Sequence, residues 1–452
     1  MKFLKFTLYL LVQVLLFGSC RDYVEVEPVG NNRVLKYTSD YRALANSYND
    51  MTSSGGIYLI ANADVEFPTT YQNGVSTIWA NSYSWQDKIY DPSQSDSDWN
   101  GLYKAVYYSN VIIDGVMSSE RGTEVEKREI YAEAFVHRAF AYLQLVNTYG
   151  PQFDPASANS EKAVPLLLKP ELFSSLERNT VGEVYDQIIS DLNSALNNGI
   201  QDTPSFNVLP SKRAVYALLA RTYLLMGQYD LSLENAEKVL QMQNGLIDLK
   251  TLASGYSYPI LIQNPEVILS KTLLLTYNRA PLSNDLLNSF ESNDLRYNYY
   301  TIPGTVAIFP QYTGRGFGIA TYSPTNGINI GVSVPEMYLI VAECNARLGN
   351  VQQAVDNLNI LRAKRYASGA SYEVSAVSSA EALSLVISER EKEFIGRGFR
   401  WFDQRRLNLD PAFRKTYTRV FKDVTYTLEP NSEGYVFPIH QNYIDLNPEL
   451  GK

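Results

Sequence analysis

Histidine is nearly absent from this 452-residue chain, and several common catalytic motifs are missing altogether. The two histidines, His137 and His440, stand far apart in unrelated contexts, so we expect neither a histidine-based zinc site nor a Ser-His-Asp triad. The sequence contains no Gly-x-Ser-x-Gly, no Walker sequence and no His-Glu-x-x-His. The glycine cluster Gly314–Gly318 lacks the spacing of a dinucleotide-binding loop and is interpreted as a flexible loop. We therefore expect a protein that has no cofactor and is not an enzyme.

Excess positive charge is also missing, because the formal net charge is −9. Binding to phosphates requires clustered Lys and Arg, so a nucleic-acid partner is not expected. The 48 acidic residues are scattered, and nothing marks a glycosidase pair of carboxylates. Asp91, Asp96 and Asp98 offer alternating oxygen ligands, but the segment lacks the glycine and the final glutamate of an EF-hand loop. Asp96 or Ser97 is better interpreted as the N-cap of a helix, and no metal site is predicted.

No hydrophobic run at the N-terminus is long enough to span a bilayer. The stretch Leu8–Phe17 is apolar except for Gln13 and is shorter than the roughly 20 residues that a spanning helix needs. The basic residues Lys2 and Lys5 precede it, and a lipobox-like Leu-Phe-Gly-Ser-Cys ends at Cys20. We predict that residues 1–19 are a secretory signal that is removed and that Cys20 is acylated. Acyl chains anchor a protein by burying methylenes, each contributing about 0.8 kcal/mol.

Residues 20–40 are expected to form an acidic tether that starts with Asp22, Glu25 and Glu27. Cys344, the only other cysteine, lies within a helical pattern. If Cys20 is acylated, the folded protein has no disulfide.

Two helical hairpins are visible in the sequence. Around 333–365, Ser333 and Glu336 have capping-box spacing, apolar residues recur at helical intervals, and Gly349 separates two helices. The region 211–243 follows the same plan, and Gly227 falls on Gly349 when the two regions are aligned. Small, large and turn residues match in place, which is typical of tetratricopeptide-type hairpins.

Further helices are predicted near 97–117, 126–149, 179–198 and 378–396 from their apolar period. A repeat unit cannot bury its apolar face alone, so we expect these helices to stack into one array. The predicted fold is mainly α, a TPR-like array of helical hairpins with long irregular loops and minor, short β elements. We expect residues 41–452 to form one domain.

The C-terminal third carries a recognisable pattern. The run Glu389–Arg406 is a Glu- and Arg-rich helix that continues into Gly-Phe-Arg-Trp-Phe-Asp-Gln-Arg-Arg, and Tyr435–Pro448 contains Val-Phe-Pro-Ile and a closing Asn-Pro. Both resemble the SusD/RagB family, from which Arg397, His440 and Tyr443 depart locally. Physically, the run Glu389–Arg406 is interpreted as a structural cluster of buried rings and paired charges, because arginine stays protonated and is a poor catalytic base.

The resemblance implies a non-enzymatic lipoprotein, anchored in outer-membrane lipid and facing outward. It would capture an oligosaccharide and deliver it to a SusC-like TonB-dependent transporter. Two alternatives remain open at this point. The cargo of the same fold could be a peptide, as in the RagB branch, or the protein could be a surface glycoside hydrolase.

Aromatic residues are abundant, with 34 Tyr, 18 Phe and 4 Trp, and flat rings favour carbohydrate or peptide recognition. We place the ligand-binding surface in the two long loop regions, 55–97 and 245–332, since loops of this length are usually functional. The first region supplies one group of candidates: Asp64, Tyr71, Trp79, Tyr83 and Trp85. The second region supplies another: Tyr277, Arg279, Tyr297, Tyr312 and Arg315. Each Trp could instead fix its loop to the helical core.

Overall fold

The computed structural model describes residues 35–51, 53–171, 173–252, 258–273, 280–318 and 327–451. The predicted lipidation residue Cys20 lies outside the described residues, and so do Tyr277 and Arg279. Among the described residues, no helix combines the length and the apolar character needed to cross a bilayer.

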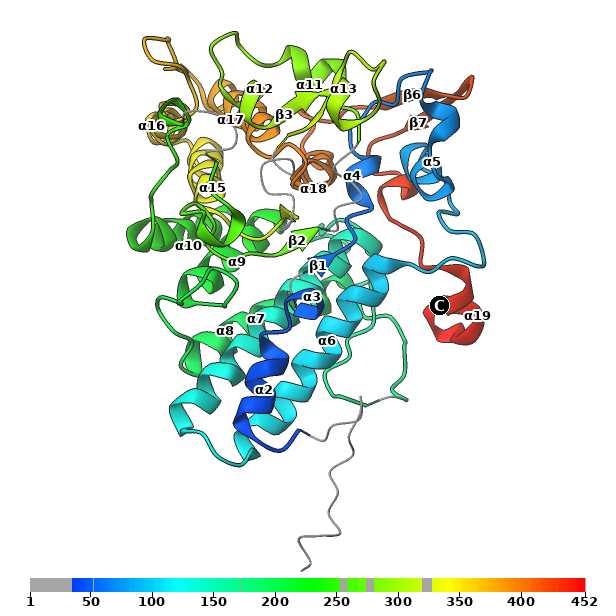
Figure 1. Cartoon of the computed structure of the whole chain (residues 1–452), viewed down its shortest axis with the longest axis vertical. Helices are drawn as coiled ribbons and strands as arrows, with labels where there is room; N and C mark the ends of the chain where they lie inside the picture. The colour runs from blue at the N-terminus through cyan, green and yellow to red at the C-terminus, as the bar shows by residue number, and fades with distance from the viewer. Residues whose placement is uncertain are drawn as a thin grey trace, which may run out of the picture.

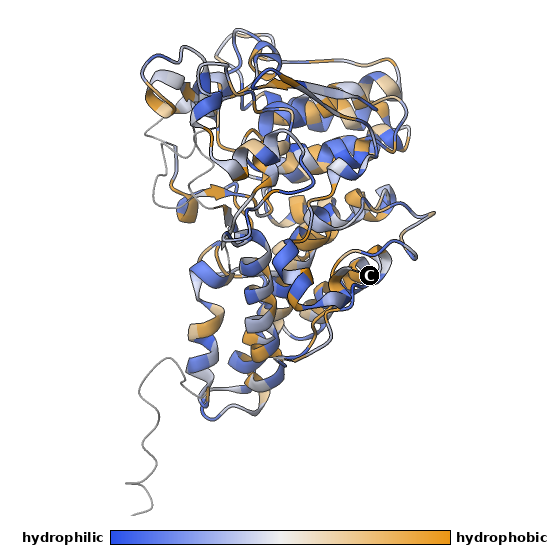
Figure 2. Cartoon of the chain, turned by 90° about the vertical axis from the view of Figure 1, so that its right-hand side faces the viewer, coloured by the Kyte–Doolittle hydropathy of each residue, from blue (hydrophilic) through white to orange (hydrophobic). Residues whose placement is uncertain are grey.

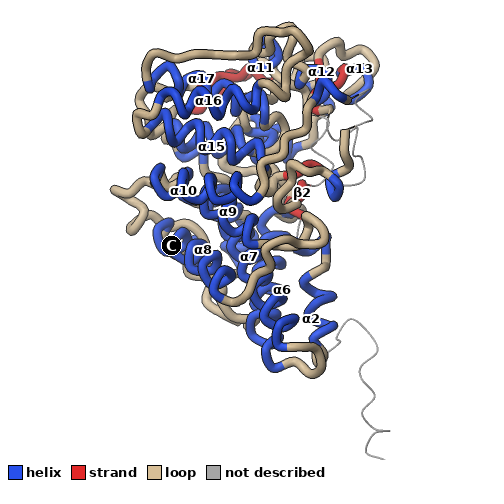
Figure 3. The backbone as a smooth tube through the Cα atoms, turned by 90° about the vertical axis from the view of Figure 1, so that its left-hand side faces the viewer, coloured by secondary structure: helices blue, strands red, loops and turns tan. Residues whose placement is uncertain are grey.

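Long helices stack on one another from one end of the molecule to the other (Figure 1, Figure 3). They are α6 (Ser97–Gly115), α7 (Glu124–Tyr149), α8 (Val181–Asn197), α9 (Lys212–Leu225), α10 (Tyr229–Met242), α15 (Val334–Arg347), α16 (Val351–Arg362) and α17 (Ser379–Glu393). Neighbours in this order pack together, with α10 against α15 and α15 against both α16 and α17. The prediction of a mainly α fold of stacked hairpins is confirmed.

Shorter elements lie in the loop regions and near the chain ends. The short helices are α2 (Thr38–Ala45), α3 (Tyr48–Met51), α4 (Tyr58–Ala61), α5 (Thr77–Tyr83), α11 (Asn284–Asn288), α12 (Arg296–Tyr299), α13 (Gly304–Ala307), α18 (Phe399–Leu407) and α19 (Gln441–Leu446). Apart from α2, α3 and α19, these helices gather at the end of the array opposite α2 (Figure 1).

Within the described residues, three small sheets connect the loops. The strands are β1 (Ser53–Ser54), β2 (Thr272–Leu273), β3 (Thr301–Pro303), β4 (Arg315–Phe317), β5 (Ile328–Asn329), β6 (Tyr417–Phe421) and β7 (Val424–Leu428). Strand β2 pairs with β1 in parallel and with β5 antiparallel, whereas β3–β4 and β6–β7 are antiparallel pairs.

The sequence explains where several helices begin and end. The Asp96 carboxylate accepts hydrogen bonds from the backbone N–H groups of Asp98 (2.9 Å) and Trp99 (3.0 Å), so it caps α6 as predicted. Gly227 and Gly349 adopt positive φ angles of 72° and 88° after α9 and α15. Glycine reaches this conformation without strain, so both hairpins turn where the sequence places the glycine.

Two local predictions were wrong. Glu336 does not reach back to Ser333 as in a capping box, because its carboxylate forms a buried ion pair with Arg221 of α9 at 2.6 and 2.7 Å. The segment Gly314–Gly318 is not a free loop, because Arg315–Phe317 forms β4 against β3. A Cβ at Gly318 would come within 2.6 Å of the Thr301 backbone, so glycine permits this close pairing.

Apolar and polar residues alternate along the helices (Figure 2), and the apolar faces bury one large core and several smaller clusters. A basic pair is enclosed in this core. The Lys271 ammonium lies 2.7 Å from Nδ1 of His137 and also donates to the Met51 carbonyl. Burial lowers the pKa of Lys271 to about 7, and burial followed by Lys271 moves the pKa of His137 well below its usual value.

The buried lysine should make stability depend on pH. Above pH 7 the folded protein releases the Lys271 proton, whereas the unfolded chain keeps it up to about pH 10.4. The unfolded state then binds more protons, so the free energy of unfolding should rise by about 2 kcal/mol between pH 7 and pH 9. Urea titrations at several pH values measure this slope, and Lys271→Met should flatten it. The exposed control Lys238→Met should leave it unchanged, and equal slopes in all three proteins would contradict the prediction.

Candidate ligand-binding site

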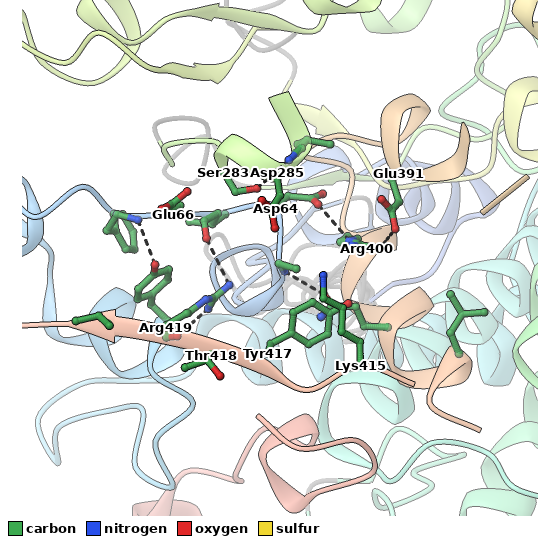
Figure 4. A pocket seen from close by; sticks show the side chains of 18 of the residues that line it. Asp64, Glu66, Ser283, Asp285, Glu391, Arg400, Lys415, Tyr417, Thr418 and Arg419 are labelled. Carbon is green, nitrogen blue, oxygen red and sulfur yellow. Dashed lines mark hydrogen bonds and ion pairs between the residues drawn. The ribbon is translucent and has the colours of Figure 1, made fainter. Parts of the chain in front are cut away.

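A cleft of about 800 Å³ opens where the first loop region meets the C-terminal third of the chain. Its walls come from residues 63–72, the start of α11, the end of α17, α18 and β6. Asp64, Glu66 and Asp285 lie on one side of the cleft, and Lys415, Tyr417 and Arg419 lie on the other (Figure 4). The lining is therefore polar and carries charges of both signs.

Asp64 forms the acidic floor of the cleft. Its side chain is 3% exposed, and its Oδ1 lies 3.2 Å from Nε of Arg400, which also pairs with Glu391. Burial raises the pKa of Asp64 to about 7, although Arg400 opposes the rise. The Asp64 carbonyl accepts a hydrogen bond from the backbone N–H of Ser283 at 2.7 Å, which ties the first loop region to α11. The cleft thus contains a carboxyl group that changes charge near neutral pH.

Five aromatic side chains, which we call the ring row, join the two loop regions. Trp79 stacks on Phe67 at 6.1 Å, Phe67 contacts Tyr71 at 6.0 Å, Tyr71 stacks on Phe309 at 5.2 Å, and Phe309 contacts Tyr312 at 5.6 Å between ring centroids. Phe67 is buried and lines the cleft, whereas the other four rings are partly exposed. The ring row therefore offers apolar ring surface next to a polar cleft.

Glycines hold the last ring of the row in place. A Cβ at either Gly304 or Gly314 would come within 2.2 Å of the Tyr312 side chain. The Gly304 N–H donates to the Gly314 carbonyl at 2.7 Å, so the backbone of these two glycines is joined next to the Tyr312 ring. Any larger residue at these two positions would displace Tyr312 from Phe309.

The structure separates the first group of sequence candidates. Asp64 and Tyr83 line the cleft, and Tyr71 and Trp79 belong to the ring row. Trp85 instead lines a second cavity of about 410 Å³ together with Tyr149 and Phe437 of the end of the chain. Its indole N–H donates to the Ala61 carbonyl at 3.0 Å, so this ring is fixed on the core side of the loop.

The second group of candidates is also divided. Tyr312 belongs to the ring row, but the Arg315 guanidinium lies 4.4 Å over the Tyr297 ring and donates to the Thr301 carbonyl at 3.1 Å. Tyr297 and Arg315 therefore support the β3–β4 pair rather than the cleft.

Sequence reasoning did not nominate Phe67, Phe309, Glu391, Arg400 or Arg419 as site residues. Phe67 and Phe309 are aromatic residues within the predicted loop regions, so these two properties could have nominated them as site residues. The Glu389–Arg406 run was predicted to be a structural cluster. That prediction fits Arg406, which pairs with Glu343, but Arg400 also forms a wall of the cleft.

Two family models match the chain. The first, described as starch-binding and associating with the outer membrane, matches residues 23–224, and the second, described as the SusD family, matches residues 334–452. The chain belongs to the SusD/RagB family. The resemblance seen in the sequence is thereby confirmed. In this SusD/RagB protein the loop region 55–97 lies within the first matched segment, and the loop region 245–332 lies between the two matched segments.

The curated relatives match this chain over only part of their own length. A SusD-like protein P2 of Formosa agariphila is 26% identical over 250 residues, which is 52% of this chain and 46% of the relative. A SusD-like protein of Bacteroides ovatus is 26% identical over 216 residues, 46% of this chain and 37% of the relative. The chain thus spans less than half the length of these relatives.

Solved structures match almost the whole fold. A SusD superfamily protein of Bacteroides thetaiotaomicron has a TM-score of 0.71 at 21% identity and covers 91% of this chain and 98% of its own. A SusD-like carbohydrate binding protein of Bacteroides vulgatus has a TM-score of 0.67 at 19% identity, covering 92% and 97%. At this identity the likeness establishes the fold, and ligand and partner have to be argued from the residues.

Proposed function

We propose that this protein is an outer-membrane lipoprotein that binds an oligosaccharide at the cell surface, along the ring row and in the adjoining cleft. The observation that carries the proposal is the continuity of the two features through Phe67, which belongs to the ring row and lines the cleft. Covering one ring face with a sugar contributes about 1–3 kcal/mol. Glu66, Asp285 and Lys415 are exposed cleft residues that can hydrogen-bond to sugar hydroxyl groups.

The same geometry favours a sugar over a peptide as cargo. Peptides commonly bind by adding a strand to an open sheet edge, whereas stacked rings suit the apolar faces of pyranoses. At this site the partly exposed surface is made of rings, and β4 is already paired with β3. The Bacteroides vulgatus structure described as a carbohydrate binding protein has the same fold, which supports this assignment.

The proposed partner is a SusC-like TonB-dependent transporter, which would receive the oligosaccharide. Family membership and the family description of association with the outer membrane support this part of the proposal. An anchored protein that binds and releases its cargo needs no bond-breaking chemistry. Accordingly, we propose that the Asp64, Arg400 and Glu391 group binds ligand and does not hydrolyse it, because Arg400 is already engaged with both carboxylates.

Removing rings from the row should weaken glycan binding. We expect Tyr71→Ala and Phe309→Ala each to lower affinity about ten- to hundredfold, which corresponds to about 1–3 kcal/mol. Isothermal titration calorimetry against a panel of neutral and acidic oligosaccharides, with products checked for hydrolysis, measures this. Tyr107→Ala serves as the matched control, since Tyr107 is a 36% exposed tyrosine on α6. Unchanged affinity in both ring variants, or tight binding of peptides alone, would contradict the proposal.

A further inference from the structure

One guanidinium joins the C-terminal hairpin to the first loop region. Arg419 of β6 is 8% exposed. Its Nη1 donates to the Tyr83 carbonyl at 2.7 Å, and its Nη2 donates to the carbonyls of Asn62 and Val65. These three carbonyls belong to the backbone on either side of Phe67 and Trp79. The loop that carries half of the ring row is therefore fastened to β6 at both of its ends.

Two rings of this loop also lie against the same guanidinium. The Cζ of Arg419 lies 4.1 Å from the centroid of Tyr83 and 4.4 Å from that of Trp85. Tyr83 in turn packs edge-on against Phe67 at 4.8 Å. A planar, delocalised cation can donate in its plane and stack on both faces, whereas an ammonium has no face to stack.

Arg419 differs from several buried arginines of the C-terminal third and resembles Arg405, which donates to the backbone carbonyls of Asn147 and Gly150. Arg390, Arg400 and Arg406 each pair with carboxylates. In the part of the chain that the structure describes, Arg419 makes no ion pair, and its donors go to backbone carbonyls of the first loop region. Burial lowers the pKa of Arg419 to about 10, so the group stays charged at neutral pH. This buried cation therefore holds the backbone and the rings of the first loop region in place.

Gln72 provides a second, uncharged link between the same elements. Its amide nitrogen donates to the carbonyls of Phe67 (3.0 Å) and Val420 (3.2 Å), and its amide oxygen accepts from the Lys422 N–H at 2.7 Å. Strand β6 therefore contacts the loop directly before and after Phe67.

We infer that Arg419 is the positioning residue of the glycan site: from the wall of the cleft, it sets the place of Phe67 and Trp79 by clamping the loop between Asn62 and Trp85. The inference rests on the proposed function and adds a buried wall residue that determines affinity through the backbone carbonyls it binds. Because contacts to a rigid ligand require closely fixed rings, a loosened clamp should weaken binding while the helical array stays folded.

The decisive variant is Arg419→Lys, which keeps the charge and a donor but removes the planar face. We expect the affinity for the tightest-binding oligosaccharide of the panel to fall about ten- to hundredfold, as for other displacements of a positioned group by about 1 Å. Tryptophan emission should shift, because the cation leaves the Trp85 indole, and this shift should be smaller in a Trp85→Phe background, where only the change around Trp79 contributes. Far-UV circular dichroism should be retained. The matched control Arg128→Lys, at an exposed arginine on α7 that does not line the cleft, should change none of these readouts.

An emission shift with affinity within about twofold of wild type would overturn the inference, since the loop would then move without effect on binding. If Arg419→Lys does not fold, Gln72→Ala tests the same clamp without a buried charge. We expect it to lower affinity several-fold, and unchanged affinity there would also overturn the inference. If the wild-type protein binds no oligosaccharide of the panel, the proposed function fails instead, while tryptophan emission still reports whether Arg419 holds the loop.

Discussion

Replacing Glu393 with alanine is expected to lower the free energy of unfolding by about 3–5 kcal/mol. The change removes one carboxylate from a buried network of ion pairs and leaves its arginine partners buried. Glu393 is 0% exposed and accepts from Arg365 at two distances of 2.9 Å and from Arg296 at 3.1 Å. Burial alone would raise the pKa of Glu393, but Arg365 and Arg296 hold it at about 2. Both guanidiniums are fully buried and would lose this acceptor at every pH above that value.

Urea denaturation followed by circular dichroism at pH 7 measures this effect. Glu234→Ala is the control, because Glu234 forms an exposed i,i+4 pair with Lys238 at 2.7 Å. Such surface pairs contribute at most about 1 kcal/mol. If Glu393→Ala were no more destabilising than the control, the network would not be a major source of stability. Glu393→Gln, which keeps hydrogen-bond acceptors, should fall between the two.

Cys20→Ser should release the protein from the membrane fraction almost completely. The expectation follows from the lipobox-like sequence before Cys20, because the serine variant would lack the acyl chains, in which each buried methylene contributes about 0.8 kcal/mol to anchoring. Fractionation of cells that express each variant, with detection in soluble and outer-membrane fractions, measures the outcome. Cys344→Ala is the matched control, because Cys344 is buried in α15 and should not affect anchoring. Membrane retention of Cys20→Ser would show that another segment anchors the chain.

The helices could be predicted because their signals are local. Gly227 and Gly349 end helices whose apolar residues recur every three to four positions, and both signals lie within one hairpin. Strands β1, β2 and β5 have only two residues each, so no alternation develops along them. Glu336 shows the limit of local reasoning. Its spacing to Ser333 fits a capping box, but a partner 115 positions earlier, Arg221, takes the carboxylate.

The candidate site could be assembled only in part from the sequence, for the same reason. Tyr71, Trp79 and Tyr312 could be nominated from ring chemistry in long loops. Their connection through Phe67 and Phe309 depends on two segments that are remote in the sequence. Trp85 carries the same ring as Trp79 and lies in the same loop. Its indole N–H donates to the Ala61 carbonyl, however, and its ring lines another cavity. Residue type alone therefore cannot predict that Trp79 belongs to the ring row and Trp85 does not.

The fastening of the first loop by Arg419 has a consequence for how the protein matures. The donor and the Asn62 carbonyl are 357 positions apart, and the backbone N–H of Ala63 similarly donates to Gln404, 341 positions away. A chain that is made and exported from its N-terminus can close the α6–α7 pair early, since those contacts are local. The loop between Asn62 and Trp85 has to wait for the C-terminal hairpin, so it is exposed through most of synthesis and export. On the proposed function, the ability to bind ligand would therefore be acquired last, after the C-terminal hairpin has been made.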